Sequence, residues 1–179
     1  MPVRVYIGHG ASGNATSMTP HVEGLRRRGF EATAIDLPVR RAEDALPVFH
    51  SLVPNASDVL PGGQSYGGRV ASLAAAEPEA AYAGLVCFSY PLHRPGGDAT
   101  WEERAAHLSR IRCPVLLLSG EADPMARLGL LREAARRIPR AELVTYPRLG
   151  HSLKPVLEDV LDRVAAFLAA LDPPGPARK

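Results

Sequence analysis

Cysteine, net charge and long apolar runs are all scarce in this sequence of 179 residues. The two cysteines, Cys87 and Cys113, stand in apolar surroundings without clustered histidines, which is typical of buried thiols and argues against both a disulfide framework and a zinc site. A formal net charge of +2 is too small for a strong field toward nucleic acid. No apolar run approaches the ~20 residues of a membrane span, and a strand-like segment replaces a signal peptide. These absences predict a cytoplasmic protein that needs no metal or other cofactor.

The composition that remains is typical of a globular protein, with 46% hydrophobic and 22% charged residues. Its length fits one compact domain. We expect that domain to cover residues 1–171 and a flexible tail to occupy residues 172–179, where proline is frequent. The expected assembly is a monomer or a homodimer.

Short β-branched runs alternate with helical patterns along the chain, which indicates crossover units around a parallel sheet. A first helix is predicted from a cap at Thr19 and Pro20 to the glycine at Gly29. The predicted strands are Val3–Ile7, Glu31–Asp36, Ser57–Leu60, Gly84–Ser89, Val115–Ser119 and Glu142–Tyr146, and the further helices are Tyr66–Ala76, Trp101–Leu108, Ala126–Arg137 and Lys154–Leu171. Six strands with helices on both faces form an open, doubly wound α/β sheet, whose ligands lie at the carboxyl ends of the strands.

The clearest functional signal is the turn Gly63-Gln64-Ser65-Tyr66-Gly67, which follows the third predicted strand. A serine in such a strand-to-helix turn adopts a strained backbone that lifts its hydroxyl clear of the sheet. Small residues two positions before and after it let the neighbouring backbone pass, and Gly63 and Gly67 meet that need. Taken alone, the pattern is equally compatible with an ordinary glycine-rich turn.

An acid and a base follow at later strand ends. Asp123 comes after the fifth predicted strand and His151 after the sixth, which gives the nucleophile, acid and base order of serine hydrolases that carry this turn. The imidazole would take the serine proton, and the carboxylate would orient the imidazole. Separately, Asp123 could cap a helix at Pro124 and His151 could be a surface loop residue. Glu121 is the reserve acid.

Acyl transfer also needs N–H donors for the oxyanion of the tetrahedral intermediate. We expect them from the backbone of Tyr66, which follows the serine, and of Ala11, in the loop after the first strand. His9 is expected to orient that loop and contribute to substrate binding. The other expected substrate contacts, assigned by adjacency to the motifs, are Tyr90, Leu92, Met125 and Leu153.

The remaining histidines are interpreted as structural or exposed. His93 is expected to be a pocket-wall or surface residue, and His21, His50 and His107 are expected to be solvated. Convergence of His9, His93 and His151 on a metal is disfavoured, because no carboxylate–histidine spacing supports it.

A competing interpretation rests on Gly8, Gly10 and Gly13, which form a literal dinucleotide-binding fingerprint after the first strand, with Asp36 at the end of the second. That fingerprint requires a helix to open within the glycine run. Here five residues separate Gly13 from the predicted cap at Thr19, and the interpretation leaves Ser65, Asp123 and His151 unexplained.

The chain resembles the small, lidless α/β-hydrolases of the dienelactone-hydrolase-like kind, and most of all a branch related to a subunit of a histone-acetyltransferase complex. The resemblance covers Val3 to Leu171, and its matching segments are Gly8–Gly13, Gly63–Ala71, Ser89–His93, Gly120–Pro124 and Gly150–Leu153. It implies Ser65 as nucleophile, Asp123 as acid and His151 as base.

Three features depart from that family. Tyr66 stands where methionine is common in the branch, and Pro61 lies in the expected central strand, where it removes a ladder donor unless the strand ends at Leu60. Dienelactone hydrolases proper use cysteine where this chain has Ser65, which argues against a dienelactone substrate.

Together the residues and the resemblance predict a serine hydrolase that acts on a small-molecule ester or thioester through an acyl-enzyme, with no nucleic-acid or membrane partner. The alternatives are a catalytically silent α/β-hydrolase-like interaction protein and, less favoured, a dinucleotide-binding protein.

Overall fold

A single parallel sheet forms the centre of the computed structural model, which describes residues 2–171. Its strands are β1 (Arg4–Gly8), β2 (Glu31–Ile35), β3 (Val59–Gln64), β4 (Leu85–Phe88), β5 (Val115–Gly120) and β6 (Ala141–Tyr146). They lie in the order β2-β1-β3-β4-β5-β6, and every neighbouring pair is parallel. The predicted six-stranded, doubly wound sheet is confirmed. The chain changes its direction of progress across the sheet between β1 and β3, which is where such sheets open a ligand crevice.

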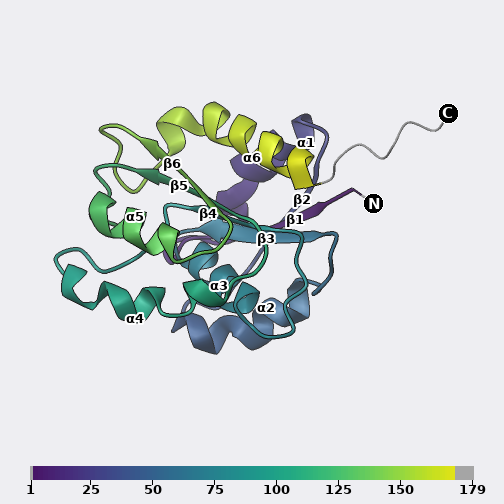
Figure 1. Cartoon of the computed structure of the whole chain (residues 1–179). Helices are drawn as coiled ribbons and strands as arrows, with labels where there is room; N and C mark the ends of the chain where they lie inside the picture. Colours follow the sequence, from purple (N-terminus) through teal and green to yellow (C-terminus); the bar gives the residue numbers. More distant parts are fainter. Residues whose placement is uncertain (1, 172–179) are drawn as a thin grey trace.

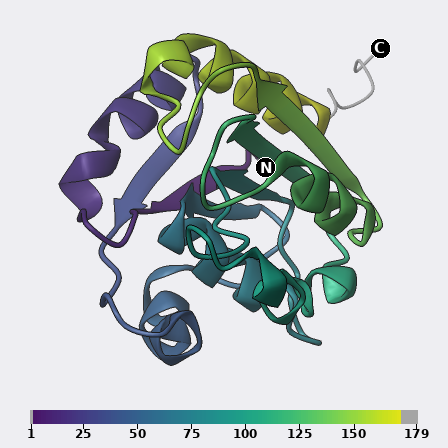
Figure 2. The same ribbon diagram turned by 90° about the vertical axis from the view of Figure 1, so that its left-hand side faces the viewer.

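Helices cover both faces of the sheet (Figure 1, Figure 2). One face carries α1 (Thr19–Arg27) and α6 (Leu157–Leu171), and the other carries α2 (Leu46–Leu52), α3 (Tyr66–Ala75), α4 (Trp101–Ala105) and α5 (Leu128–Arg136). Short 3-10 turns occupy Ala15–Met18, Ala42–Ala45, Asp98–Thr100, Leu108–Arg110 and Lys154–Val156. Each layer buries its own apolar cluster against the sheet, and fully buried Phe49 and Phe88 are among the largest side chains of the two clusters.

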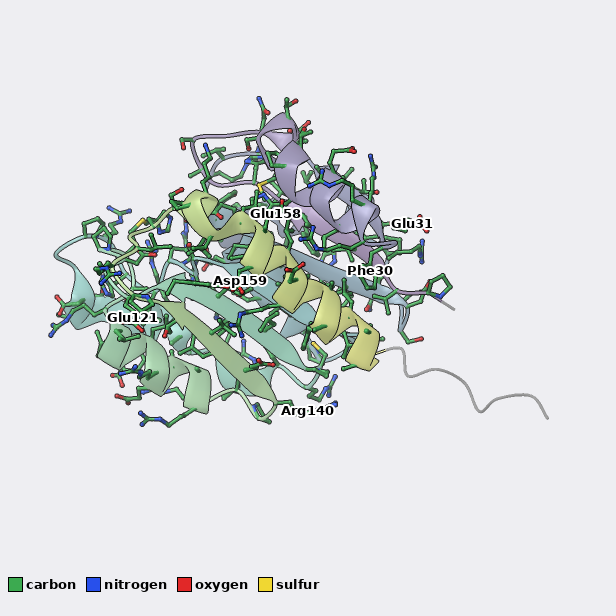
Figure 3. All side chains as sticks on the ribbon, turned by 90° about the horizontal axis from the view of Figure 1, so that it is seen from above. Phe30, Glu31, Glu121, Arg140, Glu158 and Asp159 are labelled. Atoms are coloured by element: carbon green, nitrogen blue, oxygen red, sulfur yellow. The ribbon has the colours of Figure 1, made fainter. Side chains whose placement is uncertain are left out.

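The arginine run at the end of α1 connects the two helices of one layer. Gly29 has a φ of +87°, so it ends the helix in the left-handed conformation expected of a glycine there. Arg28 Nε donates to Asp162 Oδ1 over 2.8 Å, and its Nη2 donates to Glu158 Oε2 over 2.8 Å, both on α6. Figure 3 shows α6 lying beside α1 over the sheet, with Glu158 at the junction. The run therefore joins two helices.

Several predicted boundaries differ from the structure. Thr19 lies inside α1 with Met18 as its cap residue, so the predicted threonine cap is wrong. Helix α2 was not predicted, because it has only seven residues and a single apolar residue, Phe49, supplies its fully buried contact. The predicted 101–108 helix is α4 followed by a separate 3-10 turn.

The prediction that the third strand ends at Leu60 is also wrong, because Pro61 lies within β3 opposite Tyr6 of β1. Backbone groups of successive strand residues face alternate neighbours. Ser65 donates its N–H to Phe88 O at the end of β4, so Pro61, an even number of residues earlier, directs its nitrogen to the same side. The β3–β4 ladder begins only at Gly62 and Val86. Pro61 therefore lacks its N–H at a position just before the β3–β4 ladder begins, so the ladder loses no hydrogen bond.

Residues 89–114, between β4 and β5, form only α4 and two 3-10 turns, in keeping with the predicted absence of a lid domain. Within residues 2–171, no helix has both the length and the apolar character that a membrane crossing requires. The predicted flexible tail, 172–179, lies outside the described residues, and the single-domain assignment for 1–171 stays a prediction.

Candidate active site

The turn between β3 and α3 holds Ser65 in a strained conformation, with φ 49° and ψ −111°. A Cβ on Gly67 would stand 2.4 Å from the backbone carbon of Gly8, and one on Gly63 would stand 2.5 Å from that of Gly67. Both positions therefore require glycine. The turn is fixed from both sides, because Ser65 N donates to Phe88 O over 2.8 Å and Gly67 N donates to His9 O over 2.9 Å. The sequence motif thus corresponds to a real strand-to-helix elbow.

A continuous chain of hydrogen bonds joins Ser65, His151 and Asp123. His151 Nδ1 lies 2.7 Å from Asp123 Oδ2, and His151 Nε2 lies 2.9 Å from Ser65 Oγ. A carboxylate acceptor at Nδ1 selects the tautomer with its proton there, which leaves Nε2 free to accept from the serine hydroxyl. Asp123 is only 3% exposed, and its second oxygen accepts the N–H of Met125 over 2.8 Å. The imidazole is therefore held in an orientation suited to taking the serine proton.

The reserve acid, Glu121, lies elsewhere. Its Oε1 accepts a hydrogen bond from Thr145 Oγ1 over 2.8 Å, between β5 and β6. The structure places Asp123, and not Glu121, against the imidazole.

The loop after β1 is braced by a buried histidine. His9 Nδ1 donates to Gly10 O over 2.7 Å, and its Nε2 accepts the N–H of Leu37 over 3.0 Å. Gly13 N closes the turn onto Gly10 O over 3.0 Å. His9 is 2% exposed, so it orients this loop from beneath. The backbone N–H groups of Ala11 and Tyr66 donate no hydrogen bond within residues 2–171, and both residues line the same cavity as Ser65.

The loop after β4 uses the same arrangement. His93 Nδ1 donates to Arg94 O over 2.8 Å, and its Nε2 accepts the N–H of Arg127 over 3.0 Å. His93 is 2% exposed, so neither the wall nor the surface position predicted for it describes it. In both loops a neutral imidazole fixes the backbone beside the site by donating locally and accepting from a more distant segment.

The prediction that His21 and His107 are solvated is wrong, since His107 is buried and His21 is half-buried. His107 Nε2 lies 2.8 Å from Ser72 Oγ of α3, and burial together with Arg69 lowers its pKa to about 4. His21 packs edge-on against Phe88, and burial together with Lys154 lowers its pKa to about 4. Helical periodicity alone did not reveal this burial. His50 is exposed, as expected.

Two cavities flank the hydrogen-bonded chain. The arginine cavity, of about 610 Å³, is lined by Ala11, Arg40, Arg41, Ala42, Glu43, Ser65, Tyr66, Arg69, Pro91, Arg94, Glu103, Arg104 and Met125. The Leu153 cavity, of about 350 Å³, is lined by Gly10, Ser12, Gly13, Ser17, Met18, His21, Gln64, His151, Ser152, Leu153 and Lys154. The hydrogen-bonded chain therefore lies between a strongly charged cavity and a cavity lined by smaller polar and apolar groups.

The predicted substrate contacts divide between these cavities and the core. Met125 lines the arginine cavity and Leu153 lines the other. Tyr90 and Leu92 are buried, at 2% and 0% exposure, and line neither of the two cavities. Adjacency to a motif did not show which side chains turn toward a cavity and which turn into the core. The arginines of the cavity were missed, because they come from four separate segments and no spacing in the sequence indicates that they converge.

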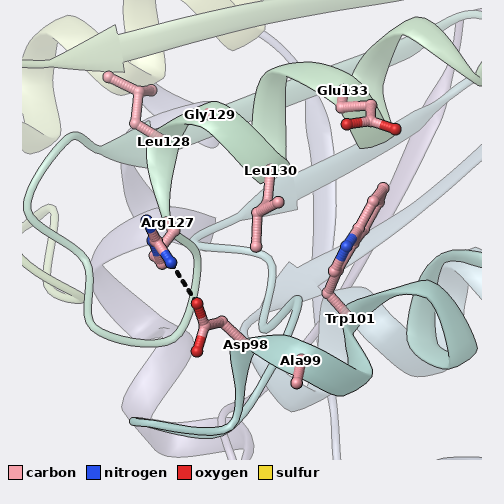
Figure 4. Close-up of a pocket in the computed structure, with 8 residues that line it drawn as sticks. All are labelled: Asp98, Ala99, Trp101, Arg127, Leu128, Gly129, Leu130 and Glu133. Carbon is pink, nitrogen blue, oxygen red and sulfur yellow. Dashed lines mark hydrogen bonds and ion pairs between the residues drawn. The ribbon is translucent and has the colours of Figure 1, made fainter.

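A further cavity, of about 430 Å³, lies between α4 and α5 and is lined by Asp98, Ala99, Trp101, Arg127, Leu128, Gly129, Leu130 and Glu133 (Figure 4). We call it the α4–α5 cavity. Arg127 forms an ion pair with Asp98 across it. None of the three residues of the Ser65 chain lines it.

Comparison with known proteins identifies the family. Residues 4–167 match the alpha/beta hydrolase domain family. The chain belongs to that family. Similar solved structures are a monoacylglycerol lipase from Paleococcus ferrophilus (16% identity, 96% of this chain and 97% of that chain covered, TM-score 0.80) and the ferulic-acid-bound Est1E from Butyrivibrio proteoclasticus (16%, 96% and 90%, 0.76). The esterase Pf2001 from Pyrococcus furiosus is also similar (18%, 94% and 81%, 0.74). At these identities the similarity shows the fold.

The dinucleotide interpretation fits this family poorly. A 3-10 turn occupies Ala15–Met18 and helix α1 begins only at Thr19, so no α-helix opens within the glycine run as that fingerprint requires. Asp36 instead accepts the N–H of Ala15 over 2.6 Å. Among the described residues there is also no group of three or more histidine, cysteine or acidic side chains arranged to hold a metal ion.

Proposed function

We propose that this chain is a serine hydrolase that cleaves an ester or thioester through an acyl-enzyme, with Ser65 as nucleophile, His151 as general base and Asp123 as the orienting acid. The observation that carries the proposal is the unbroken chain Ser65 Oγ–His151–Asp123, with links of 2.9 and 2.7 Å. Membership of the alpha/beta hydrolase domain family supports it.

In the first half-reaction, Ser65 Oγ attacks the substrate carbonyl carbon as its proton moves to His151 Nε2. Asp123 stabilises the imidazolium that forms and stays ionised itself. The tetrahedral intermediate collapses, His151 returns the proton to the leaving alcohol or thiol, and the acyl group remains on Ser65. Water activated by the same imidazole then attacks the ester, and the acid product leaves with Ser65 restored.

The oxyanion of each tetrahedral intermediate needs donors that are already in place. The Tyr66 N–H stands at the start of α3, where the helix dipole also favours negative charge. The Ala11 N–H lies on the loop that His9 braces. Neither group has a partner within the described residues, so both are available to the substrate oxygen.

Departures from the family pattern are compatible with this chemistry. The Tyr66 phenol does not reach toward the oxyanion, because its O–H donates to Pro38 O over 2.6 Å. Pro61 costs no ladder bond at the elbow. Placement in the dienelactone-hydrolase-like branch, and cytoplasmic location, stay predictions.

Labelling with a fluorophosphonate probe tests the proposal, because such probes react only with an activated serine. The native protein should be labelled, Ser65→Ala should not, and His151→Ala should be labelled far more slowly. A matched control is Ser152→Ala, which alters an exposed serine beside the site. An unlabelled native protein would overturn the proposal and favour the silent interaction protein.

A further inference from the structure

The arginine cavity concentrates positive charge in one place. Five arginines and two glutamates line it, whereas the whole sequence carries a formal net charge of only +2. Arg69 is paired, through Nη2 to Glu43 Oε1 over 2.9 Å. Within residues 2–171, the other four, Arg40, Arg41, Arg94 and Arg104, form no ion pair with a carboxylate. The excess of cations therefore lies beside the nucleophile.

Arg104 is the most constrained of these cations. It is half-buried on α4, and the structure gives its guanidinium one hydrogen bond, from Nη1 to Pro91 O over 3.2 Å. Burial, then the nearby Arg69 and Arg94, lower its pKa, yet a guanidinium remains charged at physiological pH. Among the described residues, this partly desolvated cation has two other arginines nearby and no ion-paired carboxylate. A bound anion would relieve that repulsion.

The segment that carries Arg40 and Arg41 is fixed in place. Tyr66 Oη donates to Pro38 O over 2.6 Å and accepts the N–H of Arg40 over 3.4 Å. Leu37 N donates to His9, so the same segment is also tied to the loop of Ala11. The tyrosine that replaces the common methionine after the nucleophile thus positions two arginines.

The backbone beneath Arg104 is fixed as well. Its carbonyl accepts from Arg69 Nη1 over 3.1 Å and from Tyr90 Oη over 3.3 Å. The cavity therefore presents guanidinium groups from four separate segments, and hydrogen bonds fix the backbone at Arg40 and at Arg104. Planar guanidinium forks match the oxygens of carboxylates and phosphates.

We infer that the arginine cavity binds an anionic group, a carboxylate or phosphate, carried by the ester or thioester that Ser65 cleaves. This inference rests on the proposed function for the identity of the reaction, but its charge argument stands on the cavity alone. Ala11 and Tyr66 line the same cavity as the arginines. A substrate whose carbonyl carbon is attacked by Ser65 would therefore place its other groups in the arginine cavity.

Paired esters that differ only in charge test the inference. On the acyl side, the 4-nitrophenyl ester of adipic acid is compared with the same ester methylated at its free carboxylate. On the alcohol side, 3-carboxyphenyl butyrate and 3-phosphophenyl butyrate are compared with the neutral methyl ester of the former. In at least one arm, kcat/KM corrected for spontaneous hydrolysis should be about tenfold or more higher for the anionic ester. Salt should erode this preference.

Arginine variants locate the effect. Arg104→Gln, and separately the double variant Arg40→Gln/Arg41→Gln, should each lower the anionic-to-neutral ratio of kcat/KM by about tenfold. Arg104→Lys should recover part of it, because the charge stays while the fork is lost. The control Arg132→Gln removes an exposed arginine of α5 outside this cavity and should leave the ratio unchanged. A ratio near one in all arms, or one that these variants do not alter, would overturn the inference.

A binding measurement separates this inference from the proposed function. Calorimetric titration of Ser65→Ala with monomethyl adipate and with phenyl phosphate should show saturable binding that weakens in the Arg40→Gln/Arg41→Gln background. If no ester is hydrolysed but this binding is seen, the proposed reaction fails and the anion site stands. If esters are hydrolysed without regard to charge and neither anion binds at millimolar concentration, the proposed reaction stands and the anion site is ruled out.

Discussion

The arginine cavity and the α4–α5 cavity share helix α4 and are both lined by arginine, yet their charges are arranged differently. In the α4–α5 cavity Arg127 pairs with Asp98, while Glu133 pairs with Arg137, whose guanidinium carbon lies 4.4 Å from the centre of the Trp101 ring. In the arginine cavity only Arg69 has an acidic partner among the described residues. The charges of the α4–α5 cavity are thus matched within the protein, whereas the arginine cavity leaves four arginines without an ion-paired carboxylate among residues 2–171. We propose that the first arrangement is structural and that the second binds the substrate.

The largest difference in turnover is expected between a variant of the proposed nucleophile, beside the arginine cavity, and a variant of the α4–α5 cavity. Ser65→Ala should lower ester turnover at least about 10³-fold, because the variant lacks the hydroxyl that we propose as the nucleophile. Asp98→Asn, which breaks the ion pair of the α4–α5 cavity, should leave turnover nearly unchanged. Steady-state rates on a 4-nitrophenyl ester, with circular dichroism to confirm folding, check both. Comparable losses in the two variants would mean that the cavities do not differ as described.

Asp123→Asn should have the next largest effect, a fall in kcat of about 10³ to 10⁴-fold, because the amide no longer selects the tautomer that accepts the serine proton. The matched change Glu121→Gln alters a carboxylate that contacts only Thr145 among the described side chains, and it should cost little. If Glu121→Gln were the damaging variant, the acid would have been assigned to the wrong residue.

His107 allows a test of the element that the two cavities share. It follows α4, which contributes Trp101 to one cavity and Arg104 to the other, and its bond to Ser72 ties that segment to α3. Its pKa is about 4 in the folded protein against an ordinary 6.5, so the unfolded chain binds more protons between these pH values. The contribution of His107 to the free energy of unfolding is therefore complete above pH 6.5 and is lost as the pH falls toward 4. The loss from this residue is on the order of 2–3 kcal/mol.

Urea unfolding at pH 7, 5.5 and 4.5 measures that dependence. His107→Gln should show a shallower loss of stability with falling pH than the native protein, whereas His50→Gln, which changes an exposed histidine, should follow the native curve. If the free energy of unfolding had the same pH dependence in all three proteins, the lowered pKa of His107 would not be its source.

The smallest effect is expected at the paired arginine. Arg127→Gln should lower the free energy of unfolding by less than about 1 kcal/mol, because its ion pair with Asp98 is largely exposed to solvent. The preference for anionic over neutral esters should be unaffected. A change in that preference as large as the one expected for Arg104→Gln would remove the distinction between the two cavities.

The meeting of Ser65, Asp123 and His151 could be predicted from the sequence because of a rule of topology. The carboxyl ends of parallel strands share one edge of the sheet, so polar residues that follow β3, β5 and β6 must lie near one another. The need for Gly63 and Gly67 was likewise visible, because a backbone crossing leaves no room for a Cβ. These predictions used only local pattern and strand order.

Features set by contacts between distant segments could not be predicted in this way. The position of Pro61 inside β3 depends on where the neighbouring ladder begins, and the burial of His107 depends on Ser72 of another helix. The arginine cavity draws its side chains from segments near residues 40, 69, 94 and 104, which share no spacing. Their convergence is visible only in three dimensions.

The hydrogen-bonded chain joins residues that follow an interior strand and an edge strand of the sheet, so it forms only when both strands are in place. Ser65 leaves the interior strand β3, but His151 follows β6, an edge strand that pairs only with β5 and is half-buried along most of its length. The two side chains are 86 positions apart in sequence, so their contact is non-local. Transient release of the edge strand would withdraw the imidazole while the elbow stays formed. Under the proposed function, the rate at which a probe acylates Ser65 during refolding should follow the docking of β6, and slow exchange of the β6 amides should accompany full reactivity.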